Sequence, residues 1–123
     1  MGTRGQVRVT SREFDTPLYL YAHYDADDLF DIVKRAISRG IRWEDPEYFI
    51  RIIFSEMVGD SVISGGFGIG TRQHGDIEYL VDVDVNNQLF YEYVRKGDDM
   101  IYTRGMEFSA ARDGEEPFIM GDV

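Results

Sequence analysis

The sequence predicts an α+β domain with two helices packed on one face of a mostly antiparallel sheet of about five to six strands. Two segments, residues 25–39 and 46–58, place apolar side chains at the spacing of amphipathic helices. Shorter segments before and after them alternate apolar and polar residues, as strands do. The resulting order is ββααββββ, and helices grouped between runs of strands favour this class.

Length and composition fit a single domain over residues 1–123. With 43% hydrophobic residues the chain can bury a core, so wholesale disorder is not expected. It has no cysteine, which excludes disulfides and thiolate chemistry and fits a reducing cytoplasm. No apolar run approaches the roughly 20 residues that cross a bilayer, so we expect a cytoplasmic protein without membrane contact.

The first part of the chain reads as two strands that run into a helix. Segments 6–10 and 18–23 are the strands and can pair antiparallel. Asp25 is the predicted cap of the following helix, and Gly40 is its predicted left-handed stop. One stripe of this helix is apolar: Leu29, Phe30, Val33, Ala36 and Ile37.

The second helix is apolar nearly all round, which predicts deep burial. Asp45 is its predicted cap, Pro46 its first residue and Gly59 its end. A loop is expected over 60–66. The run Gly65-Gly66-Phe67-Gly68-Ile69-Gly70 follows and predicts a strand with one face of bare backbone, against which a helix or a ring can pack closely.

Strands dominate the rest of the chain. Segment 77–85 alternates apolar and polar residues apart from Leu80, Asn86-Asn87 is a predicted hairpin turn, and 88–94 and 100–104 are the next strands. From about residue 112 the sequence is a polar tail.

One candidate site lies where the second strand meets the first helix. His23 can act as an acid, a base or a ligand, and Asp25 can orient it. Tyr24 and Arg4 can join them if the first strand pairs alongside. The competing interpretation is structural, with Asp25 as a cap and His23 as a hydrogen-bonded residue at the strand end.

Charge gives a second candidate surface. The net charge of −10 argues against direct nucleic-acid binding and suits a partner with a basic surface. The carboxylates that we expect to meet such a partner are Glu78, Asp82, Asp84, Asp98 and Asp99.

Chemical motifs are otherwise weak, so we expect neither catalytic residues nor a cofactor nor a metal. The glycine run matches no phosphate-binding pattern, and the chain has only two histidines and no metalloprotease or nucleophile motif. The stretch from Asp82 to Asn86 resembles half of a calcium loop but has Asn87 in place of the glycine and Tyr93 in place of the glutamate.

Short motifs resemble a family of small proteins of bacteriophages, prophages and some bacteria. The start Met1-Gly2-Thr3-Arg4-Gly5 and the triplet His23-Tyr24-Asp25 carry the resemblance, and the stretches 43–57, 66–69 and 81–83 are similar to longer members. Some members of this family have a glycine directly after the aspartate of the motif. In this chain that position is Ala26. The family has no assigned activity, so no catalytic residue carries over. The resemblance implies a phage or mobile-element accessory protein.

Two functions remain open. The first is a small acidic phage-type protein that binds and inhibits a host protein in the host cytoplasm, such as an anti-defence or anti-CRISPR-like factor. The second is a small-molecule-binding module or weak hydrolase at the strand–helix joint. A homodimer is compatible with either.

Overall fold

The structure is a computed structural model that describes residues 3–59 and 66–119. Its strands are β1 (Gly5–Thr10), β2 (Leu18–Ala22), β3 (Phe67–Gly70), β4 (Tyr79–Asp84), β5 (Leu89–Lys96), β6 (Asp99–Glu107) and β7 (Phe118–Ile119). Its helices are the short 3-10 turn η1 (Ala26–Asp28), α1 (Leu29–Ser38), α2 (Pro46–Val58) and α3 (Phe108–Arg112).

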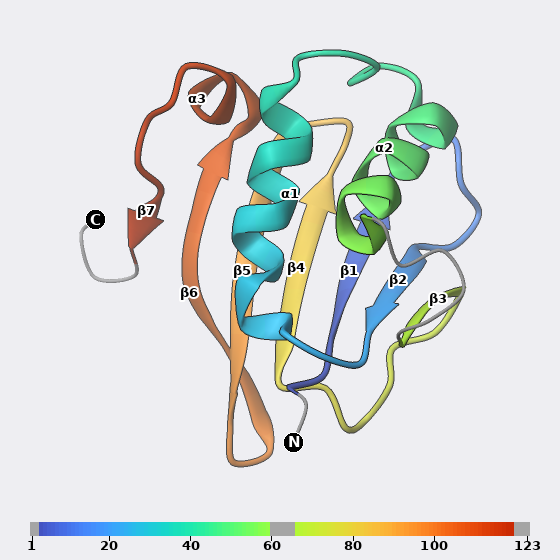
Figure 1. Ribbon diagram of the computed structural model, residues 1–123, viewed down its shortest axis with the longest axis vertical. Coiled ribbons are helices and arrows are strands. Elements are labelled where there is room, and N and C mark those ends of the chain that lie inside the picture. The colour runs from blue at the N-terminus through green and yellow to red at the C-terminus, as the bar shows by residue number, and fades with distance from the viewer. Residues whose placement is uncertain (1–2, 60–65, 120–123) are drawn as a thin grey trace.

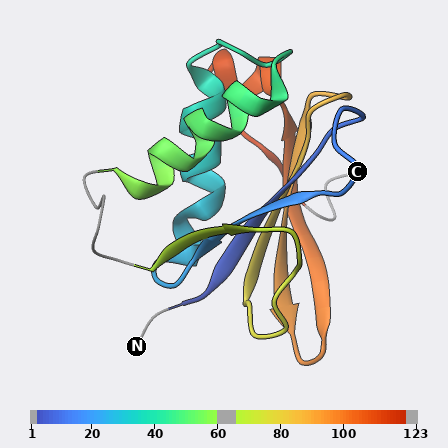
Figure 2. The same cartoon turned by 90° about the vertical axis from the view of Figure 1, so that its right-hand side faces the viewer.

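The described strands form one sheet in the order β3-β2-β1-β4-β5-β6-β7, and α1 and α2 lie on one of its faces (Figures 1 and 2). The predicted α+β class and the order ββααββββ are confirmed from β1 to β6. The sheet is mixed because β1 pairs parallel with β4, whereas its other pairs are antiparallel. Helix α3 and strand β7 lie in the last part of the chain, where the sequence shows little pattern. The predicted loop over 60–66 falls almost wholly outside the described residues.

Alternation along the strands builds the core between sheet and helices. Val7 and Val9 of β1 lie opposite Val81 and Val83 of β4, and all four are fully buried. Phe30 of α1 stacks on Phe90 of β5 with ring centroids 4.9 Å apart. Full burial of one such apolar side chain contributes about 1.5–3 kcal/mol, so this layer holds the helices on the sheet.

One ion pair is buried on the helix-covered side of β5 and β6. Glu92 is only 5% exposed and accepts hydrogen bonds from Nε of Arg104 at 2.9 Å and from Oγ1 of Thr103 at 2.7 Å. The Arg104 guanidinium also lies 4.3 Å from the centroid of the Phe30 ring. Because the carboxylate has these partners, its burial is compensated.

The ends of the helices follow the sequence in part. Gly40 and Gly59 end α1 and α2 with positive φ angles of 70° and 56°, as expected for stops. Pro46 is the first residue of α2, also as expected. Asp45 occupies the N-cap position of α2, as predicted, but its side chain makes no hydrogen bond to the helix end and instead pairs with Arg42 at 3.0 Å.

The predicted hairpin turn at Asn86-Asn87 is confirmed between β4 and β5, but its backbone differs from the expectation that an asparagine takes a positive φ. The residue that takes the positive φ is Gln88, at 55°, rather than either asparagine. Asn87 instead donates from its backbone and side chain to the carboxylate of Asp84. A side chain to backbone hydrogen bond of this kind closes the turn without a left-handed asparagine.

Candidate functional site

The strand–helix joint is a compact aromatic cluster. The His23 backbone N–H donates to the carbonyl of Gly66 at 2.8 Å, which fixes the joint against the start of β3. Its ring meets Tyr24 edge-on at 4.6 Å, and its Nδ1 lies 3.5 Å from the hydroxyl of Tyr21. The expectation that a ring packs closely against this glycine run holds at Gly66, where an added Cβ would lie 2.2 Å from Cβ and 3.0 Å from the ring Cγ of His23, but not at Gly68 or Gly70, where it would meet nothing within 4 Å.

Asp25 occupies the N-cap position of η1, which leads into α1, but it does not cap the helix through its side chain as predicted. Its side chain makes no hydrogen bond to the helix end, and its backbone is left-handed with φ of 57°. Its carbonyl accepts the N–H of Asp28, which starts the 3-10 turn. Aspartate tolerates this conformation better than most residues, so the backbone of Asp25 accounts for its place at the joint.

Arg4 lies beside the joint but pairs elsewhere. Its guanidinium bonds the carboxylate of Asp76, 72 positions along the chain. Both groups are exposed; their hydrogen bond raises the pKa of Arg4 and lowers the pKa of Asp76. Among the described residues, no ion pair joins Arg4 to Asp25, so the predicted constellation of Arg4, His23, Tyr24 and Asp25 is only half assembled.

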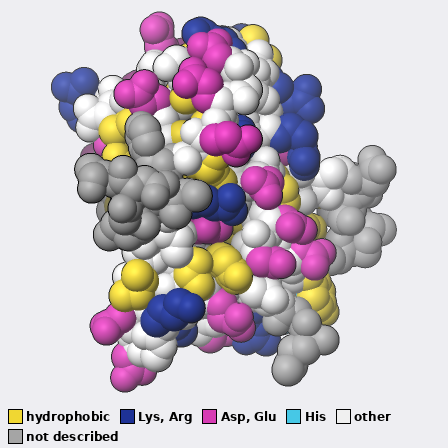
Figure 3. Space-filling view, turned by 90° about the vertical axis from the view of Figure 1, so that its left-hand side faces the viewer, with side chains coloured by type: hydrophobic (Ala, Val, Ile, Leu, Met, Phe, Trp, Pro, Cys, Tyr) yellow, Lys and Arg dark blue, Asp and Glu magenta, His cyan; other side chains and the backbone are white. Residues whose placement is uncertain are grey.

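The five carboxylates predicted to meet a partner do not form one surface. Asp82 is paired with Arg8 at 2.8 Å, and Asp84 closes the β4–β5 turn. Asp98 and Asp99 are exposed at the tip of the β5–β6 hairpin. Glu78 is exposed just before β4. Over the side of the molecule that carries β6 and β7, acidic side chains are spread among basic ones (Figure 3).

The sheet face opposite α1 and α2, here called the open face, is covered by none of the described helices (Figure 2). Three tyrosines gather on it, here called the tyrosine cluster: Tyr91 and Tyr93 of β5 and Tyr102 of β6. The ring centroid of Tyr102 lies 5.7 Å from that of Tyr91 and 6.0 Å from that of Tyr93. All three are partly exposed, and partial burial raises the pKa of Tyr91 and of Tyr93.

Two features hold the tyrosine cluster in place. Gly105 lies under it, because an added Cβ there would be 2.6 Å from Tyr91 and 2.9 Å from the Tyr102 hydroxyl. Beside it, Asp82 binds the guanidinium of Arg8 through both oxygens, at 2.8 and 3.2 Å. This bidentate pairing raises the pKa of Arg8, and in it the charges of Arg8 and Asp82 offset each other.

Sequence reasoning did not single out this cluster. The sequence does contain a trace of it, because Leu89, Tyr91 and Tyr93 recur at every second position and so share one face of the strand. A face of apolar and aromatic residues is, however, more typical of the side of a strand that points to the core. The structure turns Phe90 and Glu92 to the core instead.

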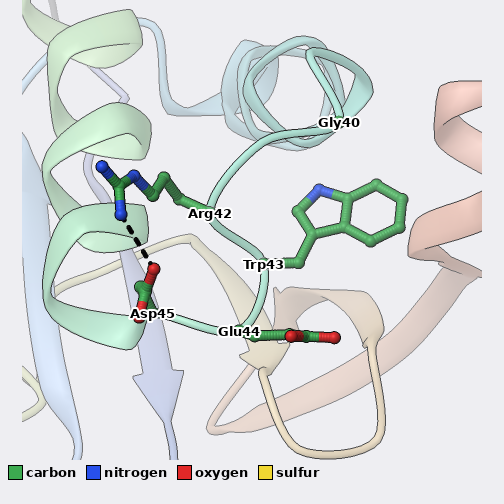
Figure 4. A pocket seen from close by; sticks show the side chains of 5 residues that line it. All are labelled: Gly40, Arg42, Trp43, Glu44 and Asp45. Atoms are coloured by element: carbon green, nitrogen blue, oxygen red, sulfur yellow. Dashed lines mark hydrogen bonds and ion pairs between the residues drawn. The ribbon is translucent and has the colours of Figure 1, made fainter.

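A separate hollow lies in the loop between α1 and α2 (Figure 4). Trp43 points to one side of it and donates from its ring N–H to the carbonyl of Ile37 at 3.0 Å. On the other side Arg42 pairs with Asp45. Trp43 also packs edge-on against Phe108 at 5.5 Å. These polar groups already have partners, so the hollow is a structural feature of the loop.

Comparisons with known proteins give no function for this chain, so a proposed function has to be argued from the geometry of the structure. No family model, curated protein or solved structure matches this chain. Across residues 3–59 and 66–119, no three acidic, histidine or cysteine side chains are grouped so that they could hold a metal. Over the same residues, none of the helices combines the length and the apolar character that a membrane span needs.

Proposed function

We propose that this chain is a binding protein that docks a basic protein through the tyrosine cluster and inhibits it. The observation that carries the proposal is the cluster itself, three partly exposed tyrosines side by side on a sheet face that no described helix covers. Tyrosine is enriched at the centres of protein interfaces because it combines a large apolar area with a hydroxyl that can find a partner.

Rigidity supports this assignment. The cluster stands on two adjacent strands, and the approach of Tyr91 and Tyr102 over Gly105 limits the positions that their rings can take. A side chain that is already ordered loses little entropy on binding, whereas a mobile one costs about 0.5–1.5 kcal/mol. Such a preordered surface lowers the entropy cost of docking a partner.

Charge selects the partner. Asp82 is neutralised by Arg8, but Asp98 and Asp99 are exposed at one end of β5 and β6, and Glu107 is exposed at the other. Together with the net charge of −10, these carboxylates favour approach of a basic surface and oppose that of nucleic acid. The partly exposed tyrosines at the centre, with charged residues such as Lys96, Asp98 and Glu107 further out, are compatible with the usual anatomy of an interface, an apolar core inside a polar rim.

Inhibition of a host protein is the part of the proposal that rests on the resemblance to small phage proteins. A protein of phage origin that binds a basic host factor and carries no evident catalytic series acts most simply by occupying that factor's surface. An anti-defence role against a nucleic-acid-handling complex fits this chemistry, since such complexes expose basic grooves that an acidic protein can cover.

The alternative, small-molecule binding or weak hydrolysis at the joint, stays a prediction. His23 and Tyr21 approach each other there, but the Arg4 guanidinium pairs with Asp76 and Asp25 acts through its backbone. Thermal-shift screening with and without His23→Ala tests it separately.

The test of the protein-binding function is capture from bacterial lysate on the immobilised chain. Three forms are compared: wild type, the double variant Tyr91→Ser with Tyr102→Ser, and Tyr48→Ser. Tyr48 is a matched control because it is 57% exposed and lies on α2, on the other side of the sheet. We expect a basic protein to be retained at low salt by wild type and by Tyr48→Ser, and to be lost from the double variant.

High salt should release the retained protein, because charge steers the encounter. The purified partner should then lose activity when the wild-type chain is added. Retention that is equal on all three forms would contradict docking through the tyrosine cluster, and retention of no protein at low salt would contradict the function.

A further inference from the structure

Three glycines of the run from Gly66 to Gly70 have different reasons to be glycine. Gly66 is required by packing, since any Cβ would collide with His23. At Gly68 and Gly70 an added Cβ would meet nothing within 4 Å, and neither residue has a positive φ. A glycine inside a strand costs about 0.5–1 kcal/mol relative to alanine, so two of them here are unexplained by the fold.

Gly68 and Gly70 belong to the wall of a pocket of about 410 Å³. The pocket is completed by Gln6, Tyr21, Arg72 and His74, together with Ile69 and Thr71. The rings of Tyr21 and His74 lie 4.9 Å apart and are tilted by 43°. A volume of this size falls in the range of small-molecule sites, and bare backbone on one wall lets a flat ring approach closely.

The pocket is built in advance by its neighbours. Gln6 is 1% exposed and holds the adjoining loop from both ends of its amide, accepting from the N–H of His74 at 2.9 Å and donating to the carbonyl of Arg72 at 3.1 Å. Arg95 holds the same loop further on, with hydrogen bonds of 2.7 and 2.9 Å to the carbonyls of Ile77 and Gly75. Loops that are fixed in this way lose little entropy when a ligand binds.

Charge in the pocket is opposite to that of the chain. No carboxylate lines it, although the sequence has 23 acidic and 13 basic residues. Arg72 is exposed, and among the described residues no ion pair engages its guanidinium. A guanidinium of this kind is suited to a phosphate or carboxylate, and the two rings are suited to an aromatic plane.

We propose that this pocket binds a small planar aromatic anion, the chemical class to which nucleoside monophosphates and aryl carboxylates belong. The aromatic plane lies on the bare backbone of Gly68 and Gly70 beside Tyr21 and His74, and its anionic group meets Arg72. The ligand is a small molecule and not a nucleic-acid strand, because one arginine can bind a single phosphate or carboxylate group, whereas a net charge of −10 repels a polyanion.

Isothermal titration calorimetry with defined probes tests the proposal. The probes are adenosine and uridine monophosphates, 4-hydroxybenzoate, adenosine without phosphate, and inorganic phosphate. We expect at least one aromatic anion to bind at millimolar or lower concentration, and adenosine and phosphate to bind about tenfold or more weakly. If the nucleotides bind and 4-hydroxybenzoate does not, the pocket accepts nucleoside monophosphates. If only 4-hydroxybenzoate binds, the pocket accepts aryl carboxylates.

Variants locate the binding. Gly68→Ala fills the wall and Arg72→Gln removes the cation, and each should weaken binding by about tenfold or more. Gly75→Ala is the matched control, since an added Cβ there also meets nothing within 4 Å and Gly75 does not line the pocket. Nitrogen-15 NMR spectra verify that each variant is folded. Failure of every aromatic anion to bind, binding of phosphate as tight as that of the nucleotides, or equal affinity for Gly68→Ala and wild type would overturn the proposal.

Discussion

Alanine substitutions in the glycine run should change the free energy of unfolding in opposite directions: Gly66→Ala should lower it, whereas Gly68→Ala and Gly70→Ala should raise it. At Gly66 the new Cβ would lie 2.2 Å from Cβ of His23, far inside a normal contact. The shifts of backbone and side chain that accommodate such overpacking lower the free energy of unfolding by about 1–3 kcal/mol. The two chain segments are also tied by the 2.8 Å hydrogen bond from the N–H of His23 to the carbonyl of Gly66. If they separate, a further 1 kcal/mol or so is lost, which gives about 2–4 kcal/mol for Gly66→Ala.

Gly68→Ala and Gly70→Ala should act in the other direction. Neither new methyl group would meet an atom within 4 Å, so each substitution should leave the native state unstrained and reduce the entropy of the unfolded chain. The expected gain is about 0.5–1 kcal/mol for each. Urea unfolding measures the stability of all three variants. We expect the midpoint urea concentration to change while the dependence of the free energy of unfolding on urea concentration stays constant. A loss at Gly68 as large as the loss at Gly66 would refute this reasoning, because the fold itself would then need the bare backbone.

Three further predictions concern polar groups that the structure places. Glu92→Ala leaves the partly buried Arg104 without its partner, so urea unfolding should show a loss of about 2–3 kcal/mol; a loss below about 0.5 kcal/mol would contradict the burial of the pair. Asp25→Ala and Asp25→Ser should each cost about 1 kcal/mol, whereas Asp25→Gly should be neutral or stabilising, because the left-handed backbone and not a cap selects the residue; a neutral Asp25→Ser would restore the cap. The hydrogen bond from Arg35, supported by Arg39, lowers the pKa of Glu56, so its contribution to stability is present above the unfolded value near 4.5 and is lost as pH falls through the lower folded pKa. Urea midpoints measured from pH 7 down to acid should therefore fall less for Glu56→Gln than for wild type, and parallel curves would contradict the shift.

Local patterns predicted the elements of the fold well. The apolar stripe of α1, Pro46 at the start of α2 and the alternation of β4 each depend on neighbours in the sequence, so they are readable from it. The parallel pairing of β1 with β4 is not, because two helices and two strands separate the partners and alternation does not encode which strand lies beside which.

The candidate site was harder to predict for the same reason. His23 and Tyr24 are adjacent in the sequence and were found, but the partner of Arg4 is Asp76 and the residues that Gln6 fixes are Arg72 and His74. These contacts span more than sixty positions, and only the sheet brings them together.

The orientation of β5 misleads a sequence reading for a different reason. Leu89, Tyr91 and Tyr93 form the more apolar side, yet they face away from the helices, while Glu92 is buried. Burial of a carboxylate is tolerated there because Arg104, on the adjacent strand, supplies a charged partner. A pattern of apolar residues alone does not contain that pairing.

Docking through the tyrosine cluster is tested most directly by site-specific photo-crosslinking. A photoreactive phenylalanine analogue replaces Tyr102 in one form of the chain and Tyr48 in another, and each form is irradiated in bacterial lysate at low and high salt. We expect one discrete adduct with a basic protein from position 102, lost at high salt, and no such adduct from position 48. The same adducts from both positions, or an adduct from position 48 alone, would contradict it.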